Sequence, residues 1–355
     1  MAITGGRILV YGATGYTGRL IAEEVARQKL PAVLAGRHRA RLAAVAEPLG
    51  LPARVASLGD GDALRRLLDG IDAVLHVAGP FSATAAPMLE ACLQTGTHYL
   101  DVTGEIDVFE AIARRDARAR ERGVVTMPGV GFDVIPTDCV AARAAAAIDS
   151  PRRLRIAIAG AGGGASRGTL KSMIESLGRG LLVRRDGILV RRPTGSLIRH
   201  FDAGAGPMRA VALPLGDVST AWYTTGVPDI EAYMVVSGPV PTLVRASRVL
   251  EPLLRRRVVQ DFLKRRVESA PEGPNELDRD SARTTVIAEV EGTSGERAVA
   301  IGETPSPYAF TAIGAVEAAR RVATGEVEPG FRTPAMAFGA EFLDTLPGCR
   351  SWDLD

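Results

Sequence analysis

The sequence is poor in cysteine and has no long apolar run, and each absence excludes a class of protein. Its 355 residues include three cysteines, Cys92, Cys139 and Cys349, which are odd in number and far apart. They predict neither a disulfide framework nor a zinc site, and no metal is expected. No stretch approaches the roughly 18 apolar residues of a membrane span. No signal peptide fits, because the first apolar segment runs directly into glycines. We therefore expect a soluble, cytoplasmic protein.

A surplus of either charge is also lacking. The chain has 43 basic and 41 acidic residues, and its net charge of +2 is too small to predict binding to nucleic acid. A small-molecule substrate is expected instead. Only three of the basic residues are lysines, Lys29, Lys171 and Lys264, and this scarcity excludes one class of enzyme below.

Apolar strands alternate with amphipathic helices over residues 1–149. This pattern predicts an α/β fold, a Rossmann-type doubly wound parallel sheet covered on both faces. Residues 150–308 contain strands that no helix follows, which is typical of a second α+β domain with a mixed sheet, used for substrate binding or dimerisation. Residues 309–355 begin with an amphipathic helix, and we expect this segment to pack back on the first domain. The apolar strand at 230–238 suits a sheet edge that pairs in a homodimer.

Three glycines lie between the first strand and the first helix, in the stretch VYGATGYTGRL at 10–20. A strand, GxxGxxG and a helix form an arrangement that binds dinucleotides, because glycines let the backbone approach a pyrophosphate at the helix N-terminus. The alternative is a glycine-rich turn in a flavodoxin-like sheet. The loop after the fourth strand should border the nicotinamide. The expected cofactor-binding residues are Gly12, Thr14, Gly15, Tyr16, Thr17, Gly18, Ala78, Gly79 and Pro80.

The end of the second strand selects between cofactors. An acidic residue there would bind ribose hydroxyls, but the stretch AGRHRARL at 35–42 has arginines and no carboxylate. A guanidinium pairs with the 2′-phosphate of NADP(H). We therefore expect NADP(H) rather than NAD(H), with Arg37 as the phosphate ligand. Arg39 and Arg41 are either further ligands or solvated helix charges.

A second glycine-rich stretch, GAGGGA at 160–165, matches GxGxxA, but no strand–helix alternation follows it. We expect it to position a helix over the substrate, with Ser166, Arg167 and Thr169 meeting an anionic or carbonyl group. The alternative is an ordinary turn. Phe81, after the fourth strand, is either a substrate contact or part of the core.

The scarcity of lysine excludes the short-chain dehydrogenases, which also carry GxxGxxG. Their chemistry needs a tyrosine with a lysine four residues later, and none of the six tyrosines has one.

Several stretches together resemble a known family. YGATGYTGRL, LAGRHRARL, VAGPF, THYLDVTGE and GVGFDVIPTDCVA are similar to the saccharopine dehydrogenase-like oxidoreductases, and closest to their bacterial trans-acting enoyl reductase branch. The resemblance covers both ends of the chain and most of the first domain. It implies a Rossmann domain, a mixed α/β second domain and NADPH-dependent reduction of C=C or C=N. It does not imply saccharopine as the substrate.

Candidate proton donors lie in and just after the strand HYLD at 98–101, on the side of the sheet where the cofactor is expected. Tyr99 and Asp101 share one face of that strand, since side chains alternate, and Glu105 follows it. A structural role as buried polar groups is the alternative for each of the three. Asp133 and Asp138 are weaker candidates, and His76 is expected in the core.

Three functions fit these observations. The first is an NADP(H)-dependent reductase of an activated C=C or C=N bond in a lipid or specialised metabolite. The second is an amino-acid or imine dehydrogenase, whose substrate carboxylates would need arginines such as Arg167, Arg184 and Arg185. The third is a non-catalytic NADP-sensing protein.

Overall fold

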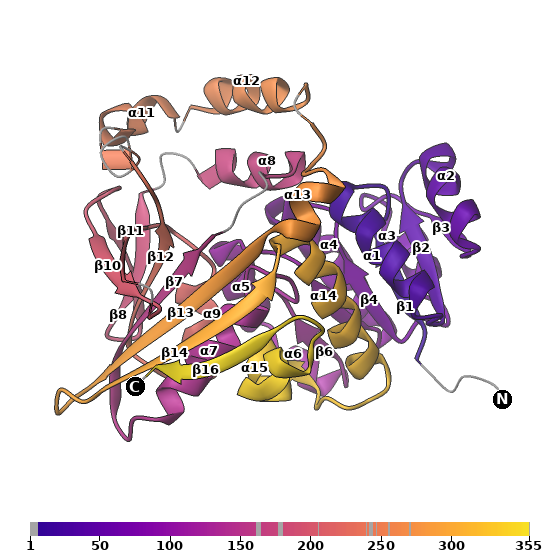
Figure 1. The fold of residues 1–355 in the computed structure, drawn as a ribbon. Coiled ribbons are helices and arrows are strands. Elements are labelled where there is room, and N and C mark those ends of the chain that lie inside the picture. Colours follow the sequence, from indigo (N-terminus) through magenta and orange to yellow (C-terminus); the bar gives the residue numbers. More distant parts are fainter. Residues whose placement is uncertain are drawn as a thin grey trace. The chain divides into compact units, whose positions relative to one another are not determined.

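The computed structural model divides the chain into two compact units. It describes residues 6–160, 165–176, 180–204, 206–238, 240, 244–245, 247–254, 256–269 and 271–354. Unit 1 comprises Met1–Phe132 and Tyr308–Ala337, and unit 2 comprises Asp133–Pro307 and Phe338–Asp355 (Figure 1). Each unit has a sheet of its own.

Unit 1 is built on a seven-stranded sheet in the order β15-β6-β5-β4-β1-β2-β3, in which every pairing is parallel. Every residue of β1, β2 and β4 is buried, as expected for apolar strands covered on both faces. The doubly wound parallel sheet predicted from the sequence is thus confirmed. The strands are β1 Ile8–Tyr11, β2 Ala32–Gly36, β3 Ala53–Val55, β4 Ala73–His76, β5 His98–Asp101, β6 Val125–Met127 and β15 Gly330–Phe331.

The order of these strands creates a switch point beside β1. From β1 the chain moves outward through β2 and β3, and it then returns to the other side of β1 to form β4. The loops after β1 and β4 therefore diverge at the carboxyl ends of these two neighbouring strands, which is where ligands of doubly wound sheets bind. The connecting helices are α1 Tyr16–Arg27, α2 Arg39–Leu49, α3 Gly61–Leu67, α4 Phe81–Thr95, α5 Ile106–Ala113, α6 Asp116–Glu121, α14 Pro307–Ala323 and α15 Pro334–Phe338.

Unit 2 has a mixed sheet in the order β10-β11-β12-β7-β13-β14-β16, with β8 pairing with β12 and β9. The β7–β12 pairing is parallel and the others are antiparallel, so the expected α+β class is confirmed. The strands are β7 Pro151–Ala159, β8 Leu181–Arg185, β9 Ile188–Arg192, β10 Ile198–Asp202, β11 Pro207–Ala212, β12 Asp229–Val235, β13 Arg283–Gly292, β14 Arg297–Pro305 and β16 Arg350–Leu354.

Helix α7 covers one face of the unit 2 sheet, the face toward which Gly302 of β14 is turned. A Cβ at Gly302 would lie 2.9 Å from Val140 of α7 and from Val286 of β13, so α7 packs closely on that face. The helices and 3-10 turns are α7 Ile135–Ala146, α8 Arg167–Ser176, α9 Asp217–Thr225, η1 Ser247–Leu250, α11 Glu251–Leu254, α12 Arg257–Val267, α13 Glu276–Ser281 and η2 Ala340–Thr345. Among the described residues, no helix is both long and apolar enough to cross a membrane.

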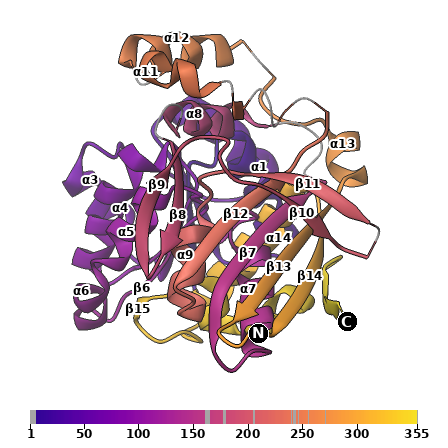
Figure 2. The same cartoon turned by 90° about the vertical axis from the view of Figure 1, so that its left-hand side faces the viewer.

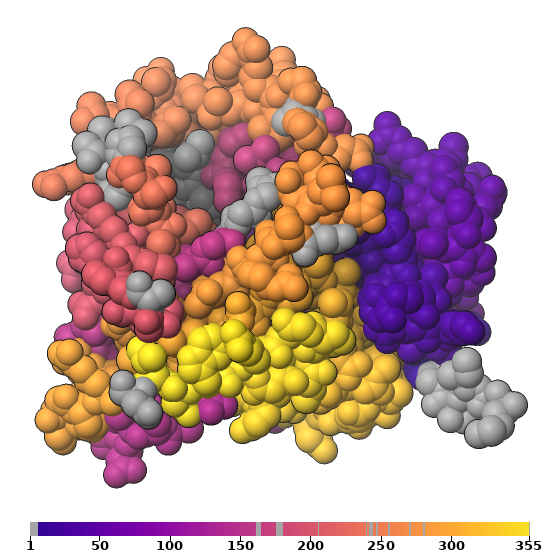
Figure 3. Space-filling model, viewed as in Figure 1, coloured from indigo at the N-terminus to yellow at the C-terminus, as the bar shows by residue number. Residues whose placement is uncertain are grey.

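The unit boundaries differ from those expected from the sequence. Unit 1 ends at Phe132 rather than at 149, because α7 packs on β13 and β14 of unit 2. Of the segment 309–355, only the part up to Ala337 belongs to unit 1. The remainder includes β16, which pairs with β14 of unit 2 and is drawn beside it in Figure 1. In the space-filling view of Figure 3, the yellow residues at the end of the chain adjoin orange ones. Alternation of strands and helices continues through α7, so it does not reveal which sheet that helix covers.

Candidate functional site

The glycine loop 12–18 brings together the loops that follow β1 and β4. Gly12 has a φ of +96°, which favours glycine, and a Cβ there would lie 2.8 Å from the backbone nitrogen of Ala78. The Val77 N–H also donates to the Tyr11 carbonyl oxygen at 2.8 Å. Gly12 therefore allows the two loops to meet at the switch point.

The other two glycines of the motif serve different purposes. A Cβ at Gly18 would overlap the Gly12 carbonyl oxygen and lie 2.9 Å from the Ala13 Cα, so α1 packs against the loop only because residue 18 is glycine. A Cβ at Gly15 would make only an ordinary 3.5 Å contact, and Gly15 is exposed with a φ of −77°. The protein itself does not need glycine at position 15. The space beside Gly15 fits a pyrophosphate, whose approach a side chain would block.

The N-terminus of α1 suits an anion. Its first turn has no acidic residue, and its N-cap Gly15 supplies no side-chain hydrogen bond. Uncompensated N–H groups and the helix dipole favour a phosphate at such a position. Thr14, Tyr16 and Thr17 are half-buried in the same turn. The Tyr16 ring packs edge-on against Tyr308 at 5.1 Å.

Arg37 lies just after β2 and is exposed. Burial raises the pKa of Tyr11, and the positive charge of Arg37 lowers it, which places the guanidinium near the end of β1. Over the described part of the chain, the Arg37 side chain has no hydrogen bond or ion pair, and the same holds for Arg39 and Arg41. Three cations without acidic partners thus follow β2, in the position expected for a 2′-phosphate site.

The loop after β4 combines exposed and buried residues. Gly79 is exposed, whereas Ala78 and Pro80 are half-buried. The Phe81 ring is only 8% exposed and packs edge-on against the His76 ring at 5.5 Å. Core packing therefore accounts for Phe81, and its role as a substrate contact stays a prediction. His76 is fully buried as expected, and burial lowers its pKa to about 3, so it is neutral.

Tyr99 and Asp101 are brought together in the interior. The Tyr99 hydroxyl donates to Asp101 Oδ2 at 2.7 Å, and Asp101 Oδ1 accepts the N–H groups of Thr103 and Gly129, both at 3.0 Å. Both side chains are fully buried. Burial raises the Asp101 pKa to about 6 although these hydrogen bonds lower it. The carboxyl group joins the loops after β5 and β6, and its role as a proton donor stays a prediction.

Glu105 lies near enough to that pair for its charge to raise both pKa values, and it caps a helix. Its two carboxylate oxygens accept the backbone N–H groups of Phe81 at 2.9 Å and Ser82 at 2.8 Å. These groups begin α4, so the carboxylate compensates the positive end of the helix dipole. Unlike α1, α4 therefore holds an internal anion at its N-terminus. The role of Glu105 as a proton donor also stays a prediction.

Replacement of Glu105 should test the capping role. Glu105→Ala is expected to lower the free energy of unfolding by about 1–2 kcal/mol, because two N–H groups lose their acceptor. Glu105→Gln retains one acceptor oxygen and should cost less. Urea unfolding measures both, with Glu23→Ala, an exposed glutamate on α1, as the control. Equal stability of Glu105→Ala and Glu23→Ala would contradict the capping role.

The other expected site residues lie in unit 2. Ser166 Oγ accepts the N–H of Thr169 at 3.2 Å and contacts its hydroxyl at 3.1 Å, which begins α8. The Arg167 N–H donates to the Glu272 carbonyl oxygen at 3.1 Å, and its guanidinium lies 3.9 Å from the Glu272 carboxylate. These partners explain the positions of the three residues without a substrate, so their role in substrate binding stays a prediction. Residues 161–164 of the second glycine stretch lie outside the described residues.

The weaker acidic candidates also lie in unit 2. Asp133 is exposed, and Asp138 is buried in the first turn of α7, where it accepts the Thr224 hydroxyl at 2.5 Å. The sequence placed both within the first domain, residues 1–149, but both belong to unit 2.

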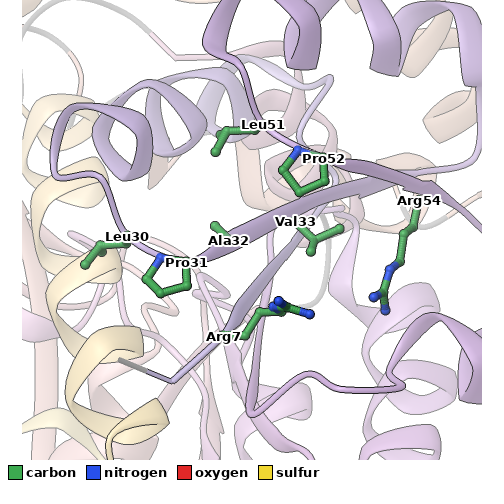
Figure 4. Close-up of a pocket in the computed structure, with 8 residues that line it drawn as sticks. All are labelled: Arg7, Leu30, Pro31, Ala32, Val33, Leu51, Pro52 and Arg54. Carbon is green, nitrogen blue, oxygen red and sulfur yellow. The ribbon is translucent and has the colours of Figure 1, made fainter. Parts of the chain in front are cut away.

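A hollow of about 410 Å³ lies at the opposite end of the unit 1 sheet (Figure 4). It is at the amino ends of β1 and β2, whereas ligands of doubly wound sheets bind at the carboxyl ends. It is therefore not the place for a dinucleotide. Its lining includes Arg7, Leu30, Pro31, Val33, Pro52 and Arg54.

This geometry agrees with a comparison to known families. Residues 8–127 match the family described as the saccharopine dehydrogenase NADP binding domain. This part of the chain is similar to that family. Its matched region begins with β1 and ends with β6, so it contains the glycine loop, Arg37 and the loop after β4. The resemblance and the NADP cofactor expected from the sequence are thereby confirmed for this domain.

Relatives of the saccharopine dehydrogenase-like domain are oxidoreductases. The chain is 32% identical to the saccharopine dehydrogenase-like oxidoreductase of Mus musculus over 151 residues, which are 37% of this chain and 35% of that protein. It is 34% identical to the trans-acting enoyl reductase of Mycobacterium leprae over 139 residues, 37% of this chain and 33% of that protein. The match thus spans about a third of the length of these relatives.

Solved structures extend the likeness to the whole fold. The apo saccharopine dehydrogenase (L-Glu forming) of Saccharomyces cerevisiae superposes with a TM-score of 0.66 at 12% identity, over 99% of this chain and 100% of that one. The homospermidine synthase of Legionella pneumophila in complex with NAD gives 0.61 at 10% identity, over 99% of this chain and 92% of that one. At such identities the likeness concerns the fold alone, and it includes unit 2.

Proposed function

We propose that the protein is an NADP(H)-dependent oxidoreductase that reduces an activated C=C or C=N bond in a lipid or specialised metabolite. The observation that carries the proposal is the pairing of two features in unit 1. Position 15 is open at an α1 N-terminus without a side-chain cap, and unpaired arginines follow the neighbouring strand β2. A pyrophosphate and a 2′-phosphate fit these two positions.

The residues of unit 1 would hold the cofactor in three places. The backbone of residues 12–18 binds the pyrophosphate, Arg37 binds the 2′-phosphate, and Ala78, Gly79 and Pro80 border the nicotinamide. When bound, NADPH supplies a hydride. Three side chains, Tyr99, Asp101 and Glu105, remain the proposed proton donors, and among them only Glu105 is not fully buried. The proposed substrate contacts are Phe81, Ser166, Arg167 and Thr169.

The amino-acid dehydrogenase alternative has less support. Arg184 donates to the carbonyl oxygens of Val218 at 2.8 Å and Gly187 at 2.7 Å and lies over the Trp222 ring. Arg185 pairs with the Glu231 carboxylate. Arg167 also lies 3.9 Å from the Glu272 carboxylate, so protein groups already engage all three arginines considered for substrate carboxylates.

Arg37→Ala tests the cofactor assignment. We expect it to weaken NADPH binding at least about tenfold and to leave NADH binding unchanged, because only NADPH carries the 2′-phosphate. Isothermal titration calorimetry measures both affinities. Arg66→Ala removes another exposed arginine, on α3, and should change neither. Equal losses for NADPH and NADH after Arg37→Ala would contradict the assignment.

The reaction itself is tested by NADPH consumption with four substrate classes. Turnover of enoyl thioesters or enones would support C=C reduction, and turnover of cyclic imines would support C=N reduction. Turnover of keto acids with an amine would favour the amino-acid dehydrogenase. Tight NADPH binding without turnover of any class would favour the NADP-sensing alternative.

A further inference from the structure

The face of the unit 2 sheet that α7 does not cover carries two charged rows. A row here is a set of residues that pair side by side across β12, β7, β13 and β14, and whose side chains therefore share one face of the sheet. Acidic and basic residues alternate along each row. The first row is Asp229, Arg153, Glu291 and Arg297, and the second is Glu231, Arg155, Glu289 and Val299. Figure 2 looks onto these strands.

The same sheet curls, so that a side chain of its edge strand β10 comes close to these rows. In the strand order, β10 is separated from β13 by β11, β12 and β7, yet Arg199 Nε of β10 lies 3.8 Å from Glu289 Oε2 of β13. An apolar cluster that includes Phe201, Tyr233 and Ile287 fills the space inside the curl. The charged rows form the mouth of the curled sheet next to this cluster, and such mouths are common ligand sites.

A cavity of about 300 Å³ lies at this mouth. Four arginines from three strands line it, together with one glutamate and one tyrosine. These six side chains are Arg153, Arg155, Arg185, Arg199, Glu231 and Tyr233, and Ser196, Leu197 and Ile198 complete the lining. With Glu289 and Glu291 counted beside them, four guanidinium groups face three carboxylates, so the surroundings carry a positive excess.

The hydrogen bonds leave many guanidinium N–H groups available. Glu231 is engaged by Arg185 and by the Tyr233 hydroxyl. Arg155, whose side chain is 9% exposed, donates one bond, from Nη1 to Glu291 at 3.2 Å. Its buried Nε lies 3.9 Å from Glu231 Oε2, which is an ion-pair distance, and has no hydrogen-bond partner among the described residues. The buried Nε of Arg199 also has none. Both Nε atoms thus face carboxylates at 3.8–3.9 Å, beyond hydrogen-bond distance, and an anion in the cavity would supply further acceptors to these guanidinium groups.

We propose that this cavity binds a small dianion with clustered oxygen acceptors, either a phosphate group or a short dicarboxylate. Its chemistry follows from the arginine fork, which matches both kinds of oxyanion. The size of the cavity fits a compact anion and not a dinucleotide. The proposal does not depend on the proposed function, because every residue of the cavity belongs to unit 2.

Calorimetric titration of the full chain with inorganic phosphate, and separately with malonate, at constant ionic strength tests the proposal. We expect one anion bound per chain. Arg199→Met and Arg153→Met should each weaken binding at least about tenfold, since each removes a charge-assisted partner. Their side chains are 38% and 39% exposed, so these variants should stay folded. Tighter binding of phosphate identifies a phosphate group as the ligand, and tighter binding of malonate identifies a dicarboxylate.

Two controls separate this cavity from other arginines. Arg209→Met removes an exposed arginine on β11 of the same sheet and should leave the affinity unchanged. Arg37→Ala should also leave it unchanged, because phosphate bound at the nucleotide site would respond to that variant instead. The proposal is overturned if neither anion binds, if Arg199→Met and Arg153→Met bind as tightly as the wild type, or if only Arg37→Ala weakens binding.

Discussion

Gly15→Ala is expected to weaken NADPH binding at least about tenfold while the protein stays as stable as the wild type. A Cβ at position 15 meets only ordinary contact within the protein, and the backbone has a φ that alanine adopts freely. The same methyl group would occupy the space that a pyrophosphate needs beside the α1 N-terminus. Calorimetric titration with NADPH and thermal unfolding measure the two effects separately.

Gly18→Ala is the matched comparison, because the same methyl group meets a different environment. At position 18 it would overlap the Gly12 carbonyl oxygen and crowd the Ala13 Cα. We expect a loss of about 2–4 kcal/mol in the free energy of unfolding, as is usual for overpacking against backbone. If Gly15→Ala destabilised the protein as much as Gly18→Ala, or left NADPH affinity unchanged, position 15 would not border the pyrophosphate.

Asp101→Ala is expected to destabilise unit 1 by about 3 kcal/mol or more. It would leave three buried donors, the Tyr99 hydroxyl and the N–H groups of Thr103 and Gly129, without an acceptor. Asp101→Asn keeps the shape and most of the hydrogen bonds. Urea unfolding should therefore rank Asp101→Ala well below Asp101→Asn. Similar stabilities of the two variants would argue against the role of Asp101 in joining the β5 and β6 loops.

The pH dependence of the Asp101→Asn variant has a definite sign. Burial raises the folded-state pKa of Asp101 to about 6, above the unfolded value of about 3.9. The protonated Asp101 side chain therefore contributes fully to the free energy of unfolding below about pH 4, and this contribution is lost as pH rises through about 6. Asn does not titrate, so only the wild type loses this contribution. The free energy of unfolding of Asp101→Asn should therefore rise by about 2–3 kcal/mol relative to that of the wild type between about pH 4 and pH 8. A difference that does not change with pH would contradict the raised pKa.

Turnover of the same variant separates the structural role of Asp101 from a catalytic one. If Asp101 donates the proton, Asp101→Asn should lose kcat at every pH although its stability is retained. If the carboxyl group only positions the loops, kcat should stay within a few-fold of the wild type. Glu105→Gln, with its own small cost in stability, offers the same comparison for the other proposed donor.

The parts of unit 1 that rest on local pattern could be predicted from the sequence. The strands β1 to β6 are short apolar runs bounded by turn residues, and the glycine motif specifies the first crossover. The strand β15 has only two residues, Gly330 and Phe331, and its position depends on pairing with β6. No local pattern indicates such a pairing, so the sequence predicted only that the segment 309–355 packs back on the first domain.

Side-chain partners were predicted less well than strands. Alternation along β5 correctly placed Tyr99 and Asp101 on one face, but the sequence does not reveal that the N–H groups of Thr103 and Gly129 complete their surroundings. The two N–H groups that Glu105 accepts come from the loop after another strand. The charged cavity of unit 2 is also indicated by a sequence pattern that the sequence analysis did not include. Arginines alternate at 153 and 155, and glutamates alternate at 289 and 291, as in strands that pair charges across a sheet.

Both units are made from two separate stretches of chain, and this constrains when each can fold during synthesis. The edge strand β15 completes the unit 1 sheet, and its partner β6 precedes it by about two hundred residues. The main chain of Gly6 packs against Ala323 of α14 so closely that a side chain at position 6 would not fit. A ribosome therefore has to make nearly all of unit 2 before unit 1 can close, and the last strand of unit 2 comes later still. Completion of both sheets should thus come late in folding, with an incomplete sheet edge on each unit exposed until then.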